Sequence, residues 1–470
     1  MASDSFIRQL QAIVGVQAVL SDDESRERYS FDALGPYRLF GRQDLTHLRV
    51  DAVVRPTQTP QISRVMRLAQ KHGVAVVPYA GGTGVMGGVI PLHGGIALDL
   101  HAMDRIIEIA SADRLARVQP GVLLADLDQA AHRHGFKLGH DPWSVGIATV
   151  GGAISTDSVG YQASKYGSMG RQVRALEVVL ADGSVVRTKP LAQPSSGPGI
   201  DPLFIGAEGT MGVITEATVQ LFLEPESRVF ATLGFESFEA GFPLVTRLFD
   251  LGLIPALIDL TEEPSSGGGQ NHPCILYLGF EGYCEEVVAQ RTRTMTEGLA
   301  AGGVDLGPGP TERYWEQRHD SAIRWREQVQ PLRPTERWER AQWRSADYLH
   351  LALPVSRVLE YHRQAQSVAA EHGLEITEAA VWTGPGLYSV FVHDPEGGEG
   401  SRQQVLAQAV DTLLDMALTL GGGVEYCHGI GMKLDRHTAR EWGDGLHLAR
   451  RLKEAVDPAH ILNPGKLGLG

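Results

Sequence analysis

A glycine-rich segment places the tightest constraint on the fold. Residues Pro78 to Gly88 read PYAGGTGVMGG and follow a β-rich apolar run. Gly82, Gly84 and Gly87 satisfy G-x-G-x-x-G, but a Rossmann turn must open a helix whose N-terminus faces the phosphates. The next residues read VIPLHGG and cannot form that helix. The segment therefore predicts a loop whose successive backbone N–H groups bind a diphosphate without a helix, and a plain surface loop is the alternative.

The elements around this loop predict an α+β fold. A strand is expected from about 47 to 54 and another from 74 to 77, with a helix between them that Thr59 caps and Gly73 ends. Asp182-Gly183 lies between VRALEVVL and SVVRT and predicts a hairpin. Hairpins mixed with helices argue against an alternating parallel sheet.

Composition and charge narrow the function classes. The 470 residues are enough for two domains, and 42 Lys and Arg against 56 Asp and Glu give a net charge of −14. Nucleic acid and anionic membranes are poor partners for such a surface. The N-terminus has no signal-peptide pattern, the longest uncharged stretch is too rich in Gly and Pro for a membrane span, and three cysteines form no disulfide framework. We therefore expect a cytoplasmic protein.

Other segments of small residues follow the glycine loop. Residues 141 to 156 place the hydroxyls of Ser144, Thr149 and Ser155 beside glycines, which suits a planar ring with polar edges, although a structural loop would look the same. The segments Lys165-Tyr166-Gly167 and 206 to 214 are individually weak signals.

Together, in their order, these segments resemble the flavin-binding domain of the vanillyl-alcohol oxidase and p-cresol methylhydroxylase family. The resemblance is strongest to its glycolate oxidase/D-lactate dehydrogenase and alkylglycerone-phosphate synthase branches, and it extends to YCHGIGMK and VDPAHILNPGKLG near the C-terminus. It implies a two-subdomain, non-Rossmann FAD-binding domain over 1–225, an antiparallel-sheet substrate or cap domain over 226–425, and a segment 426–470 that returns to the FAD domain.

The same resemblance implies where FAD binds. It places the diphosphate at the glycine loop, the flavin ring near residues 144 to 155 and the adenosine end near residues 208 to 214. Family members with covalent FAD carry a histidine where this chain has Thr83, so a dissociable cofactor is expected. The expected cofactor-binding residues are Pro78, Gly81, Gly82, Thr83, Gly84, Val85, Pro142, Ser144, Thr149, Gly151, Gly152, Ser155, Tyr166, Glu208, Gly209, Gly212, Ile214, Asn463 and Lys466.

Three residues are candidates for catalysis. Oxidation of an alcohol needs a base for the hydroxyl proton, and His428 in CHGIG matches the family histidine; a structural loop histidine is the alternative. Arg318 resembles the substrate-side arginine of the hydroxy-acid branch, or is an exposed helical arginine. Tyr388 falls where the synthase branch has a functional tyrosine, or is a strand-core residue. The metal motif of the hydroxy-acid branch is absent, so no metal site is expected.

These features predict an FAD-dependent oxidoreductase that acts on a small molecule. We expect a hydroxyl-bearing carbon, in a 2-hydroxy acid or another alcohol, to be oxidised by hydride transfer to flavin N5 with His428 as the base. The alternatives are a non-redox transferase of the alkylglycerone-phosphate synthase type, which uses a flavin–substrate adduct, and a flavin-binding scaffold without catalysis. A homodimer is possible.

Overall fold

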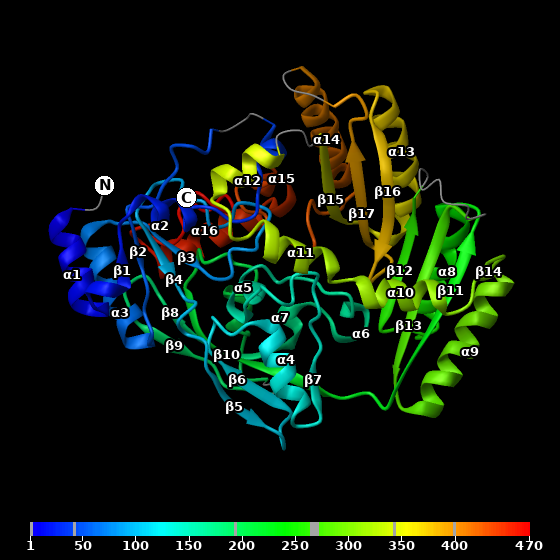
Figure 1. The fold of residues 1–470 in the computed structure, drawn as a ribbon, viewed down its shortest axis with the longest axis horizontal. Helices are drawn as coiled ribbons and strands as arrows, with labels where there is room; N and C mark the ends of the chain where they lie inside the picture. Colours follow the sequence, from blue (N-terminus) through cyan, green and yellow to red (C-terminus); the bar gives the residue numbers. More distant parts are fainter. Residues whose placement is uncertain (1–2, 41–43, 192–194, 264–271, 342–344, 398–400) are drawn as a thin grey trace.

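Strands of the described residues form three β-sheets. The computed structural model describes residues 3–40, 44–191, 195–263, 272–341, 345–397 and 401–470. Two of the sheets lie on one side of the molecule and the third on the other, with helices around them (Figure 1). The mixture of helices, hairpins and antiparallel sheets confirms the predicted α+β class.

The first sheet carries the glycine loop. Its strand order is β1 (Val19–Leu20), β2 (Ala52–Val54), β4 (Ile96–Asp99) and β3 (Val76–Tyr79), and β4 runs parallel to both β2 and β3. Helix α3 (Thr59–His72) connects β2 to β3 and ends at Gly73, where φ is +62°. Thr59 does not cap this helix, because Gln58 occupies the cap position and the Thr59 hydroxyl instead donates to Glu177 (2.6 Å).

The second sheet contains the predicted hairpin. Its six strands are β5 (Ile106–Ala110), β6 (Leu115–Val118), β10 (Val213–Leu223), β8 (Val173–Val179), β9 (Val185–Arg187) and β7 (Phe136–Leu138). Asp182-Gly183 makes the turn between β8 and β9, with Gly183 at φ +77°. The neighbouring helices are α4 (Leu124–His132), α5 (Val150–Ser155), α6 (Ala163–Tyr166) and α7 (Met169–Gln172).

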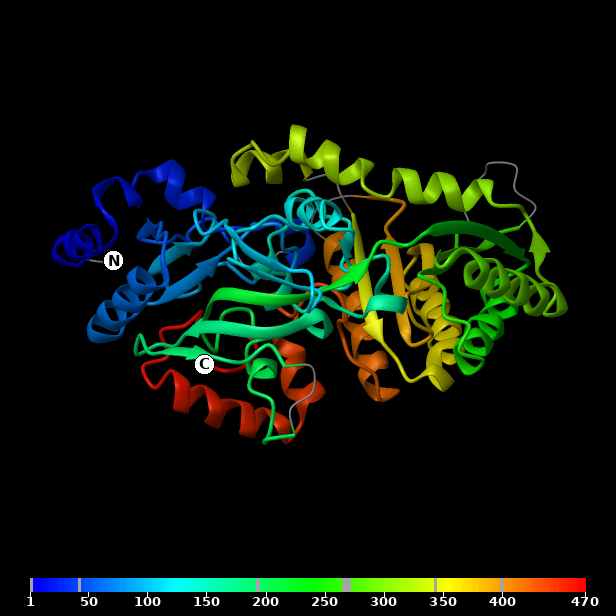
Figure 2. The ribbon, with the colours of Figure 1, turned by 90° about the horizontal axis from the view of Figure 1, so that it is seen from below.

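The third sheet is antiparallel throughout. In order, its seven strands are β14 (Val304–Asp305), β11 (Ser227–Phe235), β13 (Cys274–Gly282), β12 (Leu257–Glu262), β16 (Glu375–Trp382), β17 (Leu387–His393) and β15 (Ala346–Ala352). One face packs against α8 (Phe238–Asp250), α9 (Cys284–Ala300), α13 (Val358–Glu371) and α14 (Ser401–Thr419). The helices α10 (Gly309–Gln317), α11 (Asp320–Gln328) and α12 (Pro334–Ala341) run from this sheet toward the first one, along the upper edge of Figure 2.

The C-terminal residues lie beside the first sheet. After α15 (Thr438–Trp442) and α16 (Gly445–Val456), the Val76 N–H donates to Ile461 O (2.7 Å) and the Asn463 N–H donates to Val76 O (2.9 Å). Helices α1 (Asp4–Val14) and α2 (Asp23–Arg28) lie at the other end of the chain, in the same part of the molecule (Figure 1). The domain limits at residues 225 and 425 stay predictions.

Candidate cofactor and substrate site

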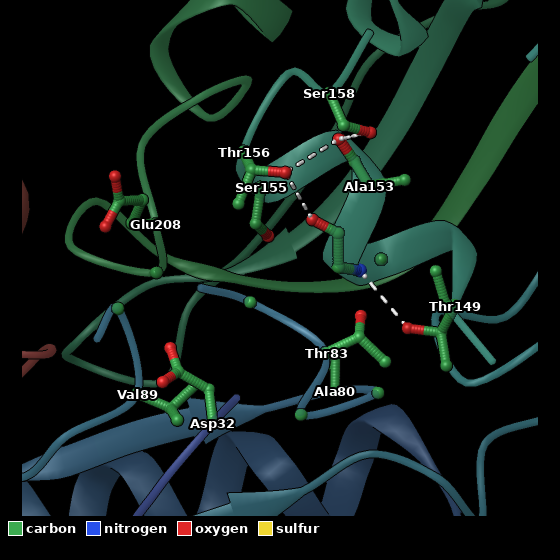
Figure 3. A pocket seen from close by; sticks show the side chains of 18 of the residues that line it. Asp32, Ala80, Thr83, Val89, Thr149, Ala153, Ser155, Thr156, Ser158 and Glu208 are labelled. Carbon is green, nitrogen blue, oxygen red and sulfur yellow. Dashed lines mark hydrogen bonds between the residues drawn. The ribbon is translucent and has the colours of Figure 1, made fainter. Parts of the chain in front are cut away.

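The glycine loop forms one wall of an elongated cavity between the first two sheets. Figure 3 shows Thr83 of this loop facing helix α5, with Asp32 and Glu208 at the other end. Most of the expected cofactor-binding residues meet here. Those that line the cavity are Pro78, Gly81, Gly82, Thr83, Gly84, Val85, Ser144, Thr149, Gly151, Gly152, Ser155, Glu208, Gly209, Gly212 and Ile214.

The loop is suited to an anion because its main chain is open. Among the described residues, no hydrogen bond uses the backbone N–H of Gly81, Gly82 or Thr83. A Cβ on Gly81 would lie 2.8 Å from Ile147 O, and one on Gly82, whose φ is +61°, would lie 2.1 Å from the Tyr79 hydroxyl. Only glycine lets the main chain pass this close to both neighbours, and the unpaired N–H groups belong to residues that line the cavity. This cradle fits the diphosphate of FAD.

The opposite wall is a short helix packed tightly against the second sheet. The Thr149 hydroxyl accepts a hydrogen bond from Gly152 N (3.3 Å) and caps α5 (Figure 3). A Cβ on Gly151 would lie 2.6 Å from Pro120 Cβ. These contacts fix Ser155, at the end of α5, on the cavity wall.

Two buried carboxylates, Asp32 and Glu208, line the other end of this cavity. Asp32 accepts N–H bonds from Leu34 (3.0 Å) and Gly87 (2.9 Å), and burial raises its pKa to about 6. Burial likewise raises the pKa of Glu208 to about 7. Lys466 balances both charges, and burial lowers its pKa to about 8.

Four of the expected cofactor-binding residues lie outside the lining. Asn463 donates to Gly88 O (2.8 Å) and Glu208 O (2.7 Å), and Lys466 donates to Ile90 O (2.7 Å), so these two hold the surrounding loops in place. Pro142 lines a neighbouring cavity. Tyr166 lies apart, with its hydroxyl bonded to Glu281 between the second and third sheets.

A second cavity opens on the face of the seven-stranded sheet opposite helices α8, α9, α13 and α14. It shares Thr83, Val85, Ser144, Ser158, Cys427 and His428 with the first cavity. His428 therefore lies where the two cavities meet. The rest of the lining combines aromatic side chains with charged and polar groups, among them Tyr37, Arg38, Trp143, Tyr161, Asp259, Tyr314, Trp325, Tyr348, His350, Glu378, Trp382 and Ser389.

His428 is held by a buried carboxylate. Glu425 Oε1 accepts the backbone N–H groups of Cys427 (2.7 Å) and His428 (3.0 Å) and lies 3.5 Å from His428 Nδ1. Burial opposes a charge on the ring, but Cys427 and Glu425 outweigh it and raise the pKa of His428 above its ordinary value. The His350 ring lies 4.6 Å from the His428 ring, and burial lowers the pKa of His350 to about 3.

Arg318 does not line either cavity. Its Nε donates to Asp141 (2.9 Å) and its guanidinium stacks on Trp315 at 3.6 Å. The guanidinium that does reach the second cavity is Arg38, which pairs with Asp347 (2.7 Å). No sequence motif marks Arg38, because its role depends on strands more than 300 residues away.

Tyr388 faces the opposite side of the sheet. Its hydroxyl bonds to His362 Nδ1 (3.0 Å) and its side chain is fully buried against Phe238. Successive side chains in a strand alternate between faces, so the next residue, Ser389, lines the cavity instead. The alternation of side chains along β17 predicts which residues share a face of the sheet. It does not predict which of the two faces lines the cavity.

Comparison with known families agrees with this geometry. Residues 50–189 match the FAD binding domain family, and residues 224–467 match the family described as FAD linked oxidases, C-terminal domain. Among the described helices, none has the length and apolar run needed to cross a membrane.

Three relatives cover most of the chain. The glycolate oxidase subunit GlcD of Bacillus subtilis (strain 168) is 29% identical and covers 98% of this chain and 96% of its own length. A D-lactate dehydrogenase of Archaeoglobus fulgidus is 30% identical, with coverage of 88% and 90%. An alkyldihydroxyacetonephosphate synthase of Trypanosoma brucei brucei is 28% identical, with coverage of 89% and 73%.

The fold is also that of a solved structure. The crystal structure of p-cresol methylhydroxylase with substrate bound aligns with a TM-score of 0.79 at 19% identity, over 99% of this chain and 96% of the other. The resemblance found in the sequence is therefore confirmed, and FAD is the cofactor that the matched families bind.

Proposed function

The chain belongs to the FAD-linked oxidase family and is an FAD-dependent oxidoreductase, and from this premise we propose that it oxidises a hydroxyl-bearing carbon with His428 as the base. The substrate is a 2-hydroxy acid or another alcohol. When bound, FAD supplies the acceptor for the hydride that leaves the carbon.

The position of His428 carries this proposal. Its side chain lines both the cofactor cavity and the second cavity, so a hydroxyl group held between them lies beside the imidazole. The Glu425 carboxylate, 3.5 Å from Nδ1, stabilises the imidazolium that forms when the ring takes the hydroxyl proton.

The residues of the first cavity would hold FAD without a covalent bond. The open N–H groups of Gly81 to Thr83 suit the diphosphate, and Thr83 provides no imidazole for attachment. Acid precipitation of the holoenzyme should leave the yellow colour in the supernatant. Colour retained on the pellet after washing would contradict non-covalent binding.

Anaerobic reduction tests the proposed oxidation. The holoenzyme is mixed, without oxygen, with a panel of 2-hydroxy acids, polyols and aryl alcohols, and the flavin absorbance near 450 nm is followed. One class should bleach the flavin and yield the matching carbonyl product. If no member of the panel bleaches it, the proposal fails.

A second candidate is a non-redox transferase. The similarity to an alkyldihydroxyacetonephosphate synthase over 89% of this chain favours it. Such an enzyme would form an ether product in the complete absence of an electron acceptor, with no net flavin reduction. Detection of that product by mass spectrometry would decide for the transferase.

Two broader expectations also stay proposals. Sedimentation of the purified holoenzyme tests the homodimer, and cell fractionation tests the cytoplasmic location.

A further inference from the structure

The cationic side chains beside the second cavity gather at its His428 end, where each has a carboxylate partner. Arg38 is its only arginine among the described lining residues. Arg38 donates to Asp347 (2.7 Å), Val85 O (3.0 Å) and the Tyr348 hydroxyl (2.9 Å). The buried Lys433 donates to the same carboxylate of Asp347 (2.6 Å), and His428 lies 3.5 Å from Glu425.

The same cavity carries two carboxylates on neighbouring strands. Asp259 of β12 lies opposite Trp382 of β16, and Ala380 and Glu378 follow on the same face of β16. Asp259 accepts hydrogen bonds from the Tyr314 hydroxyl (2.7 Å) and from Thr261. The Glu378 carboxylate has no hydrogen bond or ion pair with any other described residue, although it lies on the cavity wall.

Three aromatic rings stand beside these carboxylates. The ring of Tyr161 lies 6.1 Å from Tyr314 and 5.5 Å from Trp382, and both pairs are almost perpendicular, at 88° and 85°. All three residues line the cavity together with Asp259 and Glu378. Aromatic rings that line a cavity next to carboxylates attract an ammonium group through cation–π contacts and charge.

We propose that the second cavity binds an amino alcohol, with its ammonium group among Tyr161, Tyr314, Trp382, Asp259 and Glu378 and its hydroxyl-bearing carbon at His428. This inference rests on the proposed oxidation. The C–H bond of the carbinol breaks with its hydride passing to FAD, the O–H proton passes to His428, and a C=O bond forms. The ammonium group is unchanged in the reaction and serves to position the substrate.

Three probes that differ in the charged group on the carbinol carbon test this. 2-Amino-1-phenylethanol, 1-phenylethanol and mandelate share a phenyl carbinol and carry a cation, no charge and an anion. Their dissociation constants are measured from the perturbation of the flavin spectrum in the anaerobic holoenzyme. The amine should bind at least about ten-fold more tightly than the neutral alcohol, and mandelate more weakly than both. An amine that binds no better than 1-phenylethanol, or mandelate as the tightest ligand, overturns the inference.

Substitutions of Asp259 and Glu378 show whether the preference for the amine comes from these carboxylates. Glu378→Gln should remove most of the advantage of the amine over 1-phenylethanol, because it removes the charge of the side chain and keeps its shape. Asp259→Asn should act in the same direction if it folds. Glu375→Gln is the matched control, since Glu375 lies on the same strand and is exposed outside the cavity. An unchanged amine preference in Glu378→Gln contradicts the proposed contact.

The outcomes separate this inference from the proposed function. Tight binding of the amine without any bleaching supports the ammonium site and counts against alcohol oxidation. Bleaching by mandelate, together with tighter binding than the amine, supports oxidation and overturns the ammonium site.

Discussion

The carboxylate of Glu208 accepts hydrogen bonds from the backbone N–H groups of Ile430 (2.6 Å) and Gly431 (3.0 Å). Glu208 lines the cofactor cavity, whereas Ile430 and Gly431 directly follow the loop that carries His428. A single buried side chain therefore connects the wall of the cofactor cavity to the position of the proposed base.

Replacing Glu208 should break the connection between the wall of the cofactor cavity and the loop that carries His428. Glu208→Ala removes both acceptors and leaves the N–H groups of Ile430 and Gly431 unpaired, so we expect the rate of flavin reduction to fall about ten-fold or more. Glu208→Gln keeps one acceptor oxygen and should lose less. Stopped-flow reduction of the two variants measures this, and equal rates in Glu208→Ala and the wild-type enzyme would contradict the connection.

A methyl group in the glycine loop should expel the cofactor. In Gly81→Ala the added Cβ would lie 2.8 Å from Ile147 O, a backbone atom that cannot move aside easily. We expect the purified variant to contain less FAD per polypeptide, measured by the ratio of absorbance at 450 to 280 nm. Gly445→Ala is the control, because it has no heavy atom within 4 Å of the added Cβ. Full FAD content in Gly81→Ala would show that the loop does not contact the cofactor.

Glu281 should stabilise the fold in a pH-dependent way. It is buried between Lys137 (2.9 Å) and Arg228 (2.7 Å). Burial alone would raise its pKa, but these two cations outweigh that effect and lower the pKa to about 2. Its contribution is therefore fully present above the ordinary carboxyl pKa and is lost as the pH falls toward 2.

Urea denaturation of Glu281→Gln tests this. The substitution leaves Lys137 buried without its counter-ion, so the free energy of unfolding at pH 7 should fall by about 3 kcal/mol. The difference from wild type should shrink at pH 3. Glu297→Gln, which removes pairs with the exposed Arg293 (2.7 Å) and Arg247 (3.4 Å), should cost less than about 1 kcal/mol. A constant difference at both pH values would argue against the linkage.

Removal of metal ions should leave the reaction intact. The metal motif of the hydroxy-acid branch is replaced here by WTGPGLY at residues 382–388. Dialysis of the holoenzyme against EDTA should therefore leave the rate of flavin reduction unchanged. If activity is lost and a divalent cation restores it, the expectation is wrong and attention turns to His350, Glu425 and His428, whose ligand atoms lie within 4.8 Å of one another.

The cofactor cavity could be predicted from the sequence because its parts are local. The glycine loop, the cap of α5 and the turn near Glu208 are each encoded by a few consecutive residues. Small residues there meet backbone at distances that exclude a side chain, as Gly81 and Gly151 do. Such constraints are visible in a single segment.

The substrate cavity could not be predicted in the same way. Its wall combines residues from position 33 to position 428, and which face of each strand points inward depends on the partner strands. Tyr388 and Ser389 illustrate this, because a shift of one residue exchanges the core for the cavity. Arg318 and Arg38 are both arginines near aromatic rings, and only the packing of distant strands decides which one reaches the cavity.

The role of His428 is tested most directly by single-turnover reduction of the bound FAD in His428→Ala. With a substrate identified from the alcohol panel, the rate constant should fall by about 100-fold or more while the FAD content stays the same. In the wild-type enzyme the rate should rise with pH, because the base must be neutral, and the midpoint should lie above the ordinary histidine pKa of 6.5. A variant that reduces its flavin as fast as the wild type, with an unchanged pH profile, would contradict His428 as the base.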